Sequence, residues 1–180
     1  MSMRLERIRI EFDAEQDRLL LRILIDGGSE VSLWLTRRCV KRLWDALLKM
    51  AEWKPEIQLQ ATDEARKAVL HFEHERALQE VKFSRPGEDE PVLAEPRTQP
   101  LGPEPLLITR IQARRAPEGR TQLALLPNEG QGAHLSLNDN LLHGLMKLVQ
   151  SAVSKAEWEL PLELPKSGAL AIAAGERTIN

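Results

Sequence analysis

Two histidines three residues apart, His71 and His74, form the spacing in this sequence that most resembles part of a metal site. On a helix they would lie on one face, with Glu75 beside them, and imidazole nitrogen is a common zinc ligand. A zinc site needs at least a third fixed protein ligand, which this pair lacks. They remain the candidate metal ligands, but we expect ordinary surface histidines, and the sequence predicts no cofactor.

The single cysteine, Cys39, follows Arg37 and Arg38 near the start of a predicted helix, where cations and the helix end would lower a thiol pKa. A nucleophilic cysteine also needs a base, and nothing in the sequence places a histidine beside Cys39. The HExxH and GxxxxGKS/T motifs are absent as well. We therefore expect a buried, inert thiol, and the sequence favours a protein that is not an enzyme.

A cluster of basic residues opens the same helix. Arg37, Arg38, Lys41 and Arg42 occupy its first turns, where positive charge opposes the helix macrodipole. Because this arrangement is unfavourable for the helix itself, these four residues are candidates for binding a nucleic acid or a protein partner.

A second group of candidates is expected on the sheet face that is turned away from this helix. Strand alternation places Arg7, Arg9, Arg22 and Trp34 there. Bases of a single strand can stack on a tryptophan ring while guanidinium groups contact the phosphates. This face therefore predicts single-stranded DNA or RNA binding as one function.

The same face also carries Leu20 and Leu24 on either side of Arg22. Apolar side chains among arginines favour burial against the linker helix, another protein or a second copy of the chain. We therefore expect a non-catalytic protein-interaction or self-associating scaffold, for example a homodimer. Single-stranded nucleic-acid binding is the alternative.

The elements that position these residues recur along the chain. A shift of 102 aligns residues 14–53 with 116–155 without a gap and with eight identical residues. In both copies a Leu-X-Leu strand end precedes a helix N-cap residue, Thr36 or Asn138. The agreement of identities, caps and turns predicts an internal duplication.

Each copy is predicted to form three antiparallel strands, an amphipathic helix and a trailing strand. In the first strand the apolar residues Ile8, Ile10 and Phe12 alternate with charged residues and should face the helix. The second strand is apolar enough to be central in its sheet. The proline-marked segments 55–59 and 160–164 are interpreted as short strands near a sheet edge.

The predicted fold class is α+β: two tandem βββα(β) repeats with antiparallel sheets, related as a pseudo-twofold duplicate. Between them, residues 62–83 favour a surface helix, with strand pairing around Leu70–His74 as the alternative. Six prolines and an acidic run predict an extended loop from residue 84 to residue 105. The expected divisions are repeat 1 (1–60), a linker helix and acidic loop (61–105), repeat 2 (106–165) and a flexible tail (166–180).

Tandem units of a three-stranded sheet followed by a helix resemble the Pur-alpha repeats and the Whirly proteins. The resemblance is one of topology over both copies, and it implies a curved sheet that binds single-stranded DNA or RNA. It points to the face that carries Trp34 as the binding surface. The lysine-rich Whirly signature is absent from this sequence, and the trailing strand departs from the Whirly pattern.

Composition limits the remaining choices. A net charge of -2 and a pI near 6.1 argue against a uniformly basic surface, which a protein that binds polyanions nonspecifically would have. No apolar run approaches the roughly 20 residues of a membrane helix. With one cysteine, no disulfide can form within the chain. We therefore expect a soluble, cytoplasmic protein with no membrane partner.

Overall fold

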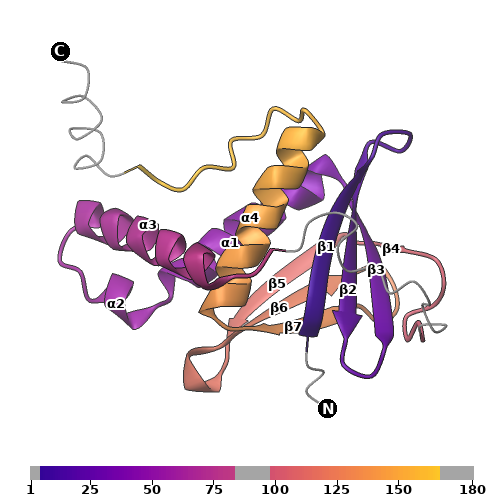
Figure 1. The fold of residues 1–180 in the computed structure, drawn as a ribbon, viewed down its shortest axis with the longest axis horizontal. Coiled ribbons are helices and arrows are strands. Elements are labelled where there is room, and N and C mark those ends of the chain that lie inside the picture. The colour runs from indigo at the N-terminus through magenta and orange to yellow at the C-terminus, as the bar shows by residue number, and fades with distance from the viewer. Residues whose placement is uncertain (1–4, 84–97, 167–180) are drawn as a thin grey trace.

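The computed structural model describes residues 5–83 and 98–166 of the 180-residue chain, which have a mixed α+β fold (Figure 1). The described strands form two sheets, one of four strands and one of three, which we call sheet A and sheet B. In chain order the elements are β1 (Leu5–Asp13), β2 (Arg18–Ile25), β3 (Ser29–Leu35), α1 (Arg37–Glu52), α2 (Pro55–Gln58), α3 (Asp63–Glu80), β4 (Leu106–Leu107), β5 (Arg110–Arg115), a 3-10 turn η1 (Pro117–Gly119), β6 (Thr121–Leu126), β7 (Ala133–Leu137) and α4 (Asp139–Lys155).

Sheet A has the strand order β1-β2-β3-β4. Its first three strands pair antiparallel, and the short β4 pairs parallel with β3. The apolar β2 is therefore a central strand, as predicted. Gly27 and Gly28 have φ values of 85° and 78° in the tight turn between β2 and β3, a region that glycine enters without the steric cost of a Cβ atom.

Sheet B is an antiparallel sheet with the order β5-β6-β7. One stretch of chain joins it to sheet A. The Ile108 amide donates to the carbonyl oxygen of Trp34 on β3, and the next amide, of Thr109, donates to the carbonyl oxygen of Leu126 on β6, both at 3.0 Å. The chain therefore leaves the edge of one sheet and enters the edge of the other within two residues.

The helices that follow the two sheets begin where the sequence predicts. The side chain of Thr36 accepts a hydrogen bond from the Cys39 amide, and that of Asn138 accepts one from the Leu141 amide, so each caps its helix. α1 packs mainly on β5 of sheet B, whereas α4 packs on β1 of sheet A. Each of these helices therefore covers the sheet formed by the other half of the chain.

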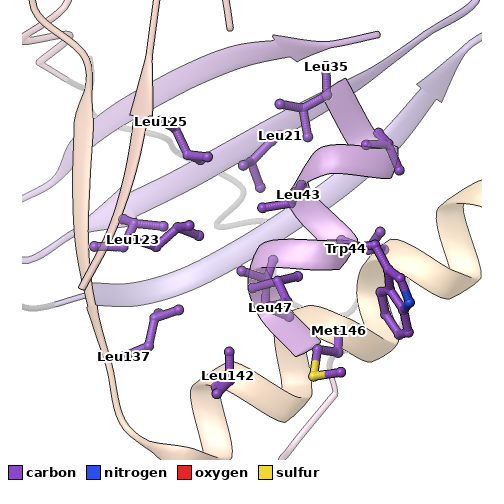
Figure 2. Close-up of a cluster of buried hydrophobic side chains, with 14 of the residues drawn as sticks. Leu21, Leu35, Leu43, Trp44, Leu47, Leu123, Leu125, Leu137, Leu142 and Met146 are labelled. Atoms are coloured by element: carbon purple, nitrogen blue, oxygen red, sulfur yellow. The ribbon is translucent and has the colours of Figure 1, made fainter. Parts of the chain in front are cut away.

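Both sheets and both helices share one apolar core. Figure 2 shows Leu43 and Leu47 of α1 surrounded by leucines of both sheets and by α4. All of these side chains are almost completely buried. The labelled core residues are Leu21 and Leu35 of sheet A, Leu123, Leu125 and Leu137 of sheet B, Leu43, Trp44 and Leu47 of α1, and Leu142 and Met146 of α4.

The segment between the two halves contains α3, which confirms the helix interpretation of residues 62–83. The strand alternative around Leu70–His74 is wrong, because that stretch lies inside α3. Leu70, His74 and Ala77 are buried at spacings of four and three, which is the period of a helix, and α3 packs against α4 (Figure 1).

Both trailing strands were predicted wrongly. Residues 55–58 form the short helix α2, with Pro55 in its first turn, where proline's missing amide and fixed φ are favourable. The alternating pattern there was misleading, because Ile57 is buried but Leu59 is 83% exposed. Residues 160–164 form no strand, since Pro161 interrupts the segment and it lies against α4 through a hydrogen bond from Gln150 to the Leu162 carbonyl.

The predicted acidic loop and flexible tail fall largely on residues 84–97 and 167–180, outside the described residues. Where the description resumes, Thr98 forms a bridge with Ser29 of β3, and the Glu30 amide donates to the Thr98 carbonyl oxygen at 2.8 Å. None of the helices in the described ranges is long and apolar enough to cross a membrane.

Candidate binding surface

Alternating burial separates the two faces of sheet A. On β2, every second side chain from Leu19 to Ile25 is buried, and those between them are partly exposed. On β3, Leu33 is completely buried, whereas its neighbour Trp34 is partly exposed. The buried side chains face the helices, which all lie on one side of sheet A (Figure 1). We call the opposite side the outer face.

Strand register arranges the outer face in three rows of side chains. Read from β1 to β3, the rows are Glu11, Leu20 and Trp34; Arg9, Arg22 and Ser32; and Arg7, Leu24 and Glu30. The structure therefore brings Arg7, Arg9, Arg22 and Trp34 onto one face, as strand alternation predicts.

The first row is the apolar part of the outer face. Leu20 and Trp34 are directly paired neighbours, and Leu107 of β4 pairs with Trp34 on its other side. Leu107 is 39% exposed, which is unusual among the large apolar side chains of the described residues. The three side chains form a continuous strip across the sheet, which we call the apolar strip.

Arg22 lies beside the apolar strip and has an unsatisfied nitrogen. Its Nε atom is 3.7 Å from Oε2 of Glu11, too far for a hydrogen bond. Solvent does not reach that nitrogen, and it has no hydrogen-bond partner among the described residues. A buried donor without a partner costs free energy, so an acceptor brought by a bound partner would stabilise a complex at this position.

Arg37 belongs to an intramolecular cluster at the start of α1. Its Nη2 lies 2.8 Å from Oδ2 of Asp17, and its guanidinium group stacks 5.3 Å from the ring centre of Trp158. Trp158 in turn donates from Nε1 to Oδ1 of Asp17 at 2.7 Å. The hydrogen bond from Trp158 and, next, those from Arg37 lower the pKa of the Asp17 carboxyl despite an opposing effect of desolvation. Arg37 therefore links Trp158, in the segment that follows α4, to Asp17 in the turn between β1 and β2.

The other predicted basic residues of α1, Arg38, Lys41 and Arg42, are exposed. They lie on the solvent side of a helix whose opposite side faces the core. The candidate residues thus divide between a sheet face and a helix end. Cys39, between them in sequence, is buried, and this burial raises the pKa of its thiol to about 11 although the charge of Arg42 opposes the effect.

The two candidate metal ligands have different partners. His71 Nε2 lies 2.9 Å from the Pro165 carbonyl oxygen, to which it donates when that nitrogen carries the proton. His74 instead pairs with His143 of α4, Nδ1 to Nδ1, at 2.8 Å. No group of three or more His, Cys, Asp or Glu side chains in the described part of the chain is placed to hold a metal ion.

The pair of His74 and His143 was not predicted. His74 and His143 are both buried, and burial is the main cause that lowers the pKa of each imidazole, to about 4 for His143. The sequence signal that could have indicated a buried His143 was its position next to Leu142 in the apolar stripe of α4. Its partner is 69 residues away, a distance that local patterns do not bridge.

A lysine that no sequence motif marks as functional lies at the centre of an ion cluster close to this pair. Lys54, just before α2, contacts Glu73 of α3 and is 2.7 Å from Oδ2 of Asp139 on α4. Glu73 also accepts from Arg76 at 2.7 Å. Burial opposes the charged form of Glu73, but the hydrogen bonds from Lys54 and Arg76 outweigh it and lower the pKa of the carboxyl. The cluster ties three helices together.

Comparisons of the chain with protein-family models, curated proteins and solved structures found no match.

Proposed function

We propose that this protein is a non-catalytic interaction module that self-associates through the outer face of sheet A. The apolar strip beside the arginines carries the proposal. Protein interfaces combine an apolar centre with a polar rim, and tryptophan and arginine contribute a large share of their binding energy. Trp34 lies between Leu20 and Leu107, and Arg22 next to the strip has a nitrogen that requires an acceptor.

Charge complementarity favours a second copy of the chain as the partner. A twofold interface brings the same patch of both copies together. With the axis parallel to β2, the β1 column of one copy faces the β3 column of the other. Arg7 of one copy would then face Glu30 of the other, because both belong to the row centred on Leu24. Leu20 and Leu24 would face their own counterparts and bury apolar surface. Arg22, between them on β2, would also face its own counterpart, and Glu11 beside each Arg22 would offset these like charges.

The positions of the titratable groups support a non-catalytic role in this proposal. His74 and His143, whose pKa values are lowered by burial, pack against each other between two helices. A catalytic base has to reach its substrate, and these two rings are almost completely covered by protein. We further propose a reducing, cytoplasmic location, since the single thiol of Cys39 is buried and has no disulfide partner within the chain.

We also propose that the two halves arose from one duplicated βββα unit with a pseudo-twofold relationship. Both halves have three antiparallel strands followed by a capped helix, and the caps Thr36 and Asn138 are 102 positions apart, the same shift that aligns the sequences. The reciprocal packing of α1 on β5 and of α4 on β1 supports the same idea. Leu20, Trp34 and the arginines of the outer face all belong to the first half, and the second half adds only Leu107 to the apolar strip, so binding is assigned mainly to the first half.

Sedimentation equilibrium tests the self-association. The wild-type chain should form a dimer at micromolar concentration, and Trp34→Glu should weaken dimerisation by about a hundredfold or more, because it places a charge in the apolar centre. Gln112→Glu is the matched control, since Gln112 is an exposed side chain on the corresponding face of sheet B. A wild-type chain that stays monomeric, or a dimer unaffected by Trp34→Glu, would refute the proposal.

Single-stranded nucleic-acid binding is the second candidate, because Trp34 shares the outer face with three arginines. Alanine variants at the same two positions test it with a fluorescent oligothymidine. Binding through this face should weaken steeply as salt increases and should be lost in Trp34→Ala but retained in Gln112→Ala. No detectable binding at low salt would exclude this function and leave the self-association result unaffected.

A further inference from the structure

A cavity of about 480 Å³ lies between the two sheets, away from the outer face. One wall comes from sheet A and the segment before β4, and the other comes from β6, β7 and the loop between them. The lining residues are Leu5, Ile23, Ile25, Val31, Pro100 and Leu101 on the first wall, and Leu126, Gly130, Gln131, Gly132, Ala133, His134, Leu135 and Ser136 on the second. The volume is in the range of small-molecule sites, about 300–1,000 Å³.

The chemistry of the two walls differs. The sheet A wall is apolar throughout, whereas the polar side chains, those of Gln131, His134 and Ser136, all belong to β7 or the loop before it. Among the described residues, no Asp, Glu, Lys or Arg lines the cavity. A charged ligand would therefore lose its hydration without gaining an opposite charge. The walls suit an uncharged molecule with an apolar body and hydrogen-bonding groups along one side.

The cavity follows the open edge of β7. Four consecutive residues of that strand, from Ala133 to Ser136, line it, although successive side chains of a strand point to opposite faces. Among the described strands, β7 pairs only with β6. Its other edge therefore offers backbone amide and carbonyl groups to a ligand, in addition to the side chains.

The loop that forms one end of the cavity is held in place by a glycine. A Cβ atom on Gly132 would lie 2.2 Å from the Leu125 carbonyl oxygen and 2.9 Å from Cα of Leu126, so only glycine allows the chain to pass this close to β6. This close backbone packing fixes the loop against the sheet, and the site is therefore formed before any ligand binds.

We propose that this cavity is a binding site for a small, uncharged, largely apolar molecule that hydrogen-bonds along β7. The site is independent of self-association through the outer face, because it lies on the inner side of sheet A, where Ile23, Ile25 and Val31 are buried. A ligand there would contact both sheets at once and stabilise their relative arrangement.

A pair of fluorescent compounds tests both the site and its charge preference. N-phenyl-1-naphthylamine is uncharged, and anilinonaphthalene sulfonate has the same aromatic rings with an added negative charge. The uncharged compound should bind saturably and at least about tenfold more tightly than the anion. In methyl NMR spectra, its binding should shift the signals of Ile23, Ile25 and Val31 more than those of Leu43 and Leu47.

A variant in which a larger side chain fills the cavity tests whether the compound binds there. Ala133→Leu adds three carbons to a lining residue and should weaken binding by about tenfold or more. Ala113→Leu, on β5 outside the lining, is the control. If Ala133→Leu does not fold, Ser136→Leu takes its place, and the NMR shifts of the wild-type chain still decide the location. No saturable binding, a preference for the anion, shifts centred elsewhere or undiminished binding by a folded, filled variant would each overturn the proposal.

Discussion

The Nδ1 atoms of His74 on α3 and His143 on α4 are 2.8 Å apart in the interior of the protein. At this distance one nitrogen must carry a proton and donate it while the other accepts. The bond therefore requires at least one neutral ring. Burial lowers the pKa of both imidazoles, and for His143 the neighbouring His74 ring adds to this effect and the pKa is about 4. Acid should consequently break a contact that joins two helices.

Stability should fall as the pH is lowered from about 6.5, the ordinary histidine value, toward about 4. In this range the unfolded chain takes up protons that the folded pair does not, so the free energy of unfolding should decrease by on the order of 1 kcal/mol per pH unit. Urea unfolding at several pH values measures this slope. The lowered pKa of Glu73 acts in a more acidic range, below its ordinary value of 4.5.

Replacing both histidines tests this assignment, because replacing only one would leave the other imidazole buried without a hydrogen-bond partner. The double variant His74→Leu/His143→Leu should lose most of the dependence between pH 6.5 and 4, whereas His134→Gln should retain it, since His134 is exposed on β7. An unchanged slope in the double variant would show that other groups produce the effect.

Lys54→Met should destabilise the protein by roughly 2 kcal/mol, because it leaves the carboxylate of Glu73 largely buried without its lysine. The remaining contact of Glu73 with Arg76 keeps the loss below that of a fully isolated charge. Lys67→Met is the matched control, since Lys67 pairs with the exposed Asp63 on the surface of α3 and should contribute little. Urea unfolding at pH 7 compares the two, and equal losses would contradict the central role assigned to Lys54.

Local patterns in the sequence were sufficient for the strands of sheet A and for the starts of the two long helices. Alternation from Leu19 to Ile25 set the buried face of β2, and Thr36 and Asn138 satisfied helix amides within three residues of themselves. These features depend on neighbours in the chain. The location of Arg7 and Trp34 on one face followed from alternation and strand pairing alone.

Features that depend on distant contacts were missed. Nothing near Arg37 indicated that Asp17 and Trp158 would surround it, and the His74 contact with His143 links segments 69 residues apart. The segment from residue 55 alternated like a strand, yet the described sheet edges do not pair with it and Pro55 starts a helix instead. Tertiary context therefore overrode local pattern in these places.

Cys39 should react with a disulfide reagent at pH 8 at least about a hundredfold more slowly in the folded protein than in guanidinium chloride, because the thiolate is the reactive form and burial raises the thiol pKa to about 11. Arg42→Gln should leave the folded rate similarly low, since the arginine only partly opposes the effect of burial. Stopped-flow absorbance follows both reactions. A folded rate close to that of the unfolded chain would mean that the helix start opens readily and exposes the thiol.

A charge exchange on the outer face decides whether the proposed dimer has the twofold geometry described above. Arg7→Glu and Glu30→Arg alone should each weaken dimerisation by about tenfold, because each places like charges opposite one another across the interface. The double variant should recover most of the wild-type affinity, since the opposed pair is then restored with its signs reversed. Arg114→Glu, an exposed charge change on sheet B, is the control for net charge. Sedimentation equilibrium gives the dissociation constants of the wild type, the three variants and the control. If the losses in the double variant simply add, Arg7 and Glu30 do not face each other, and the strand-parallel axis must be replaced by another pairing of the same face.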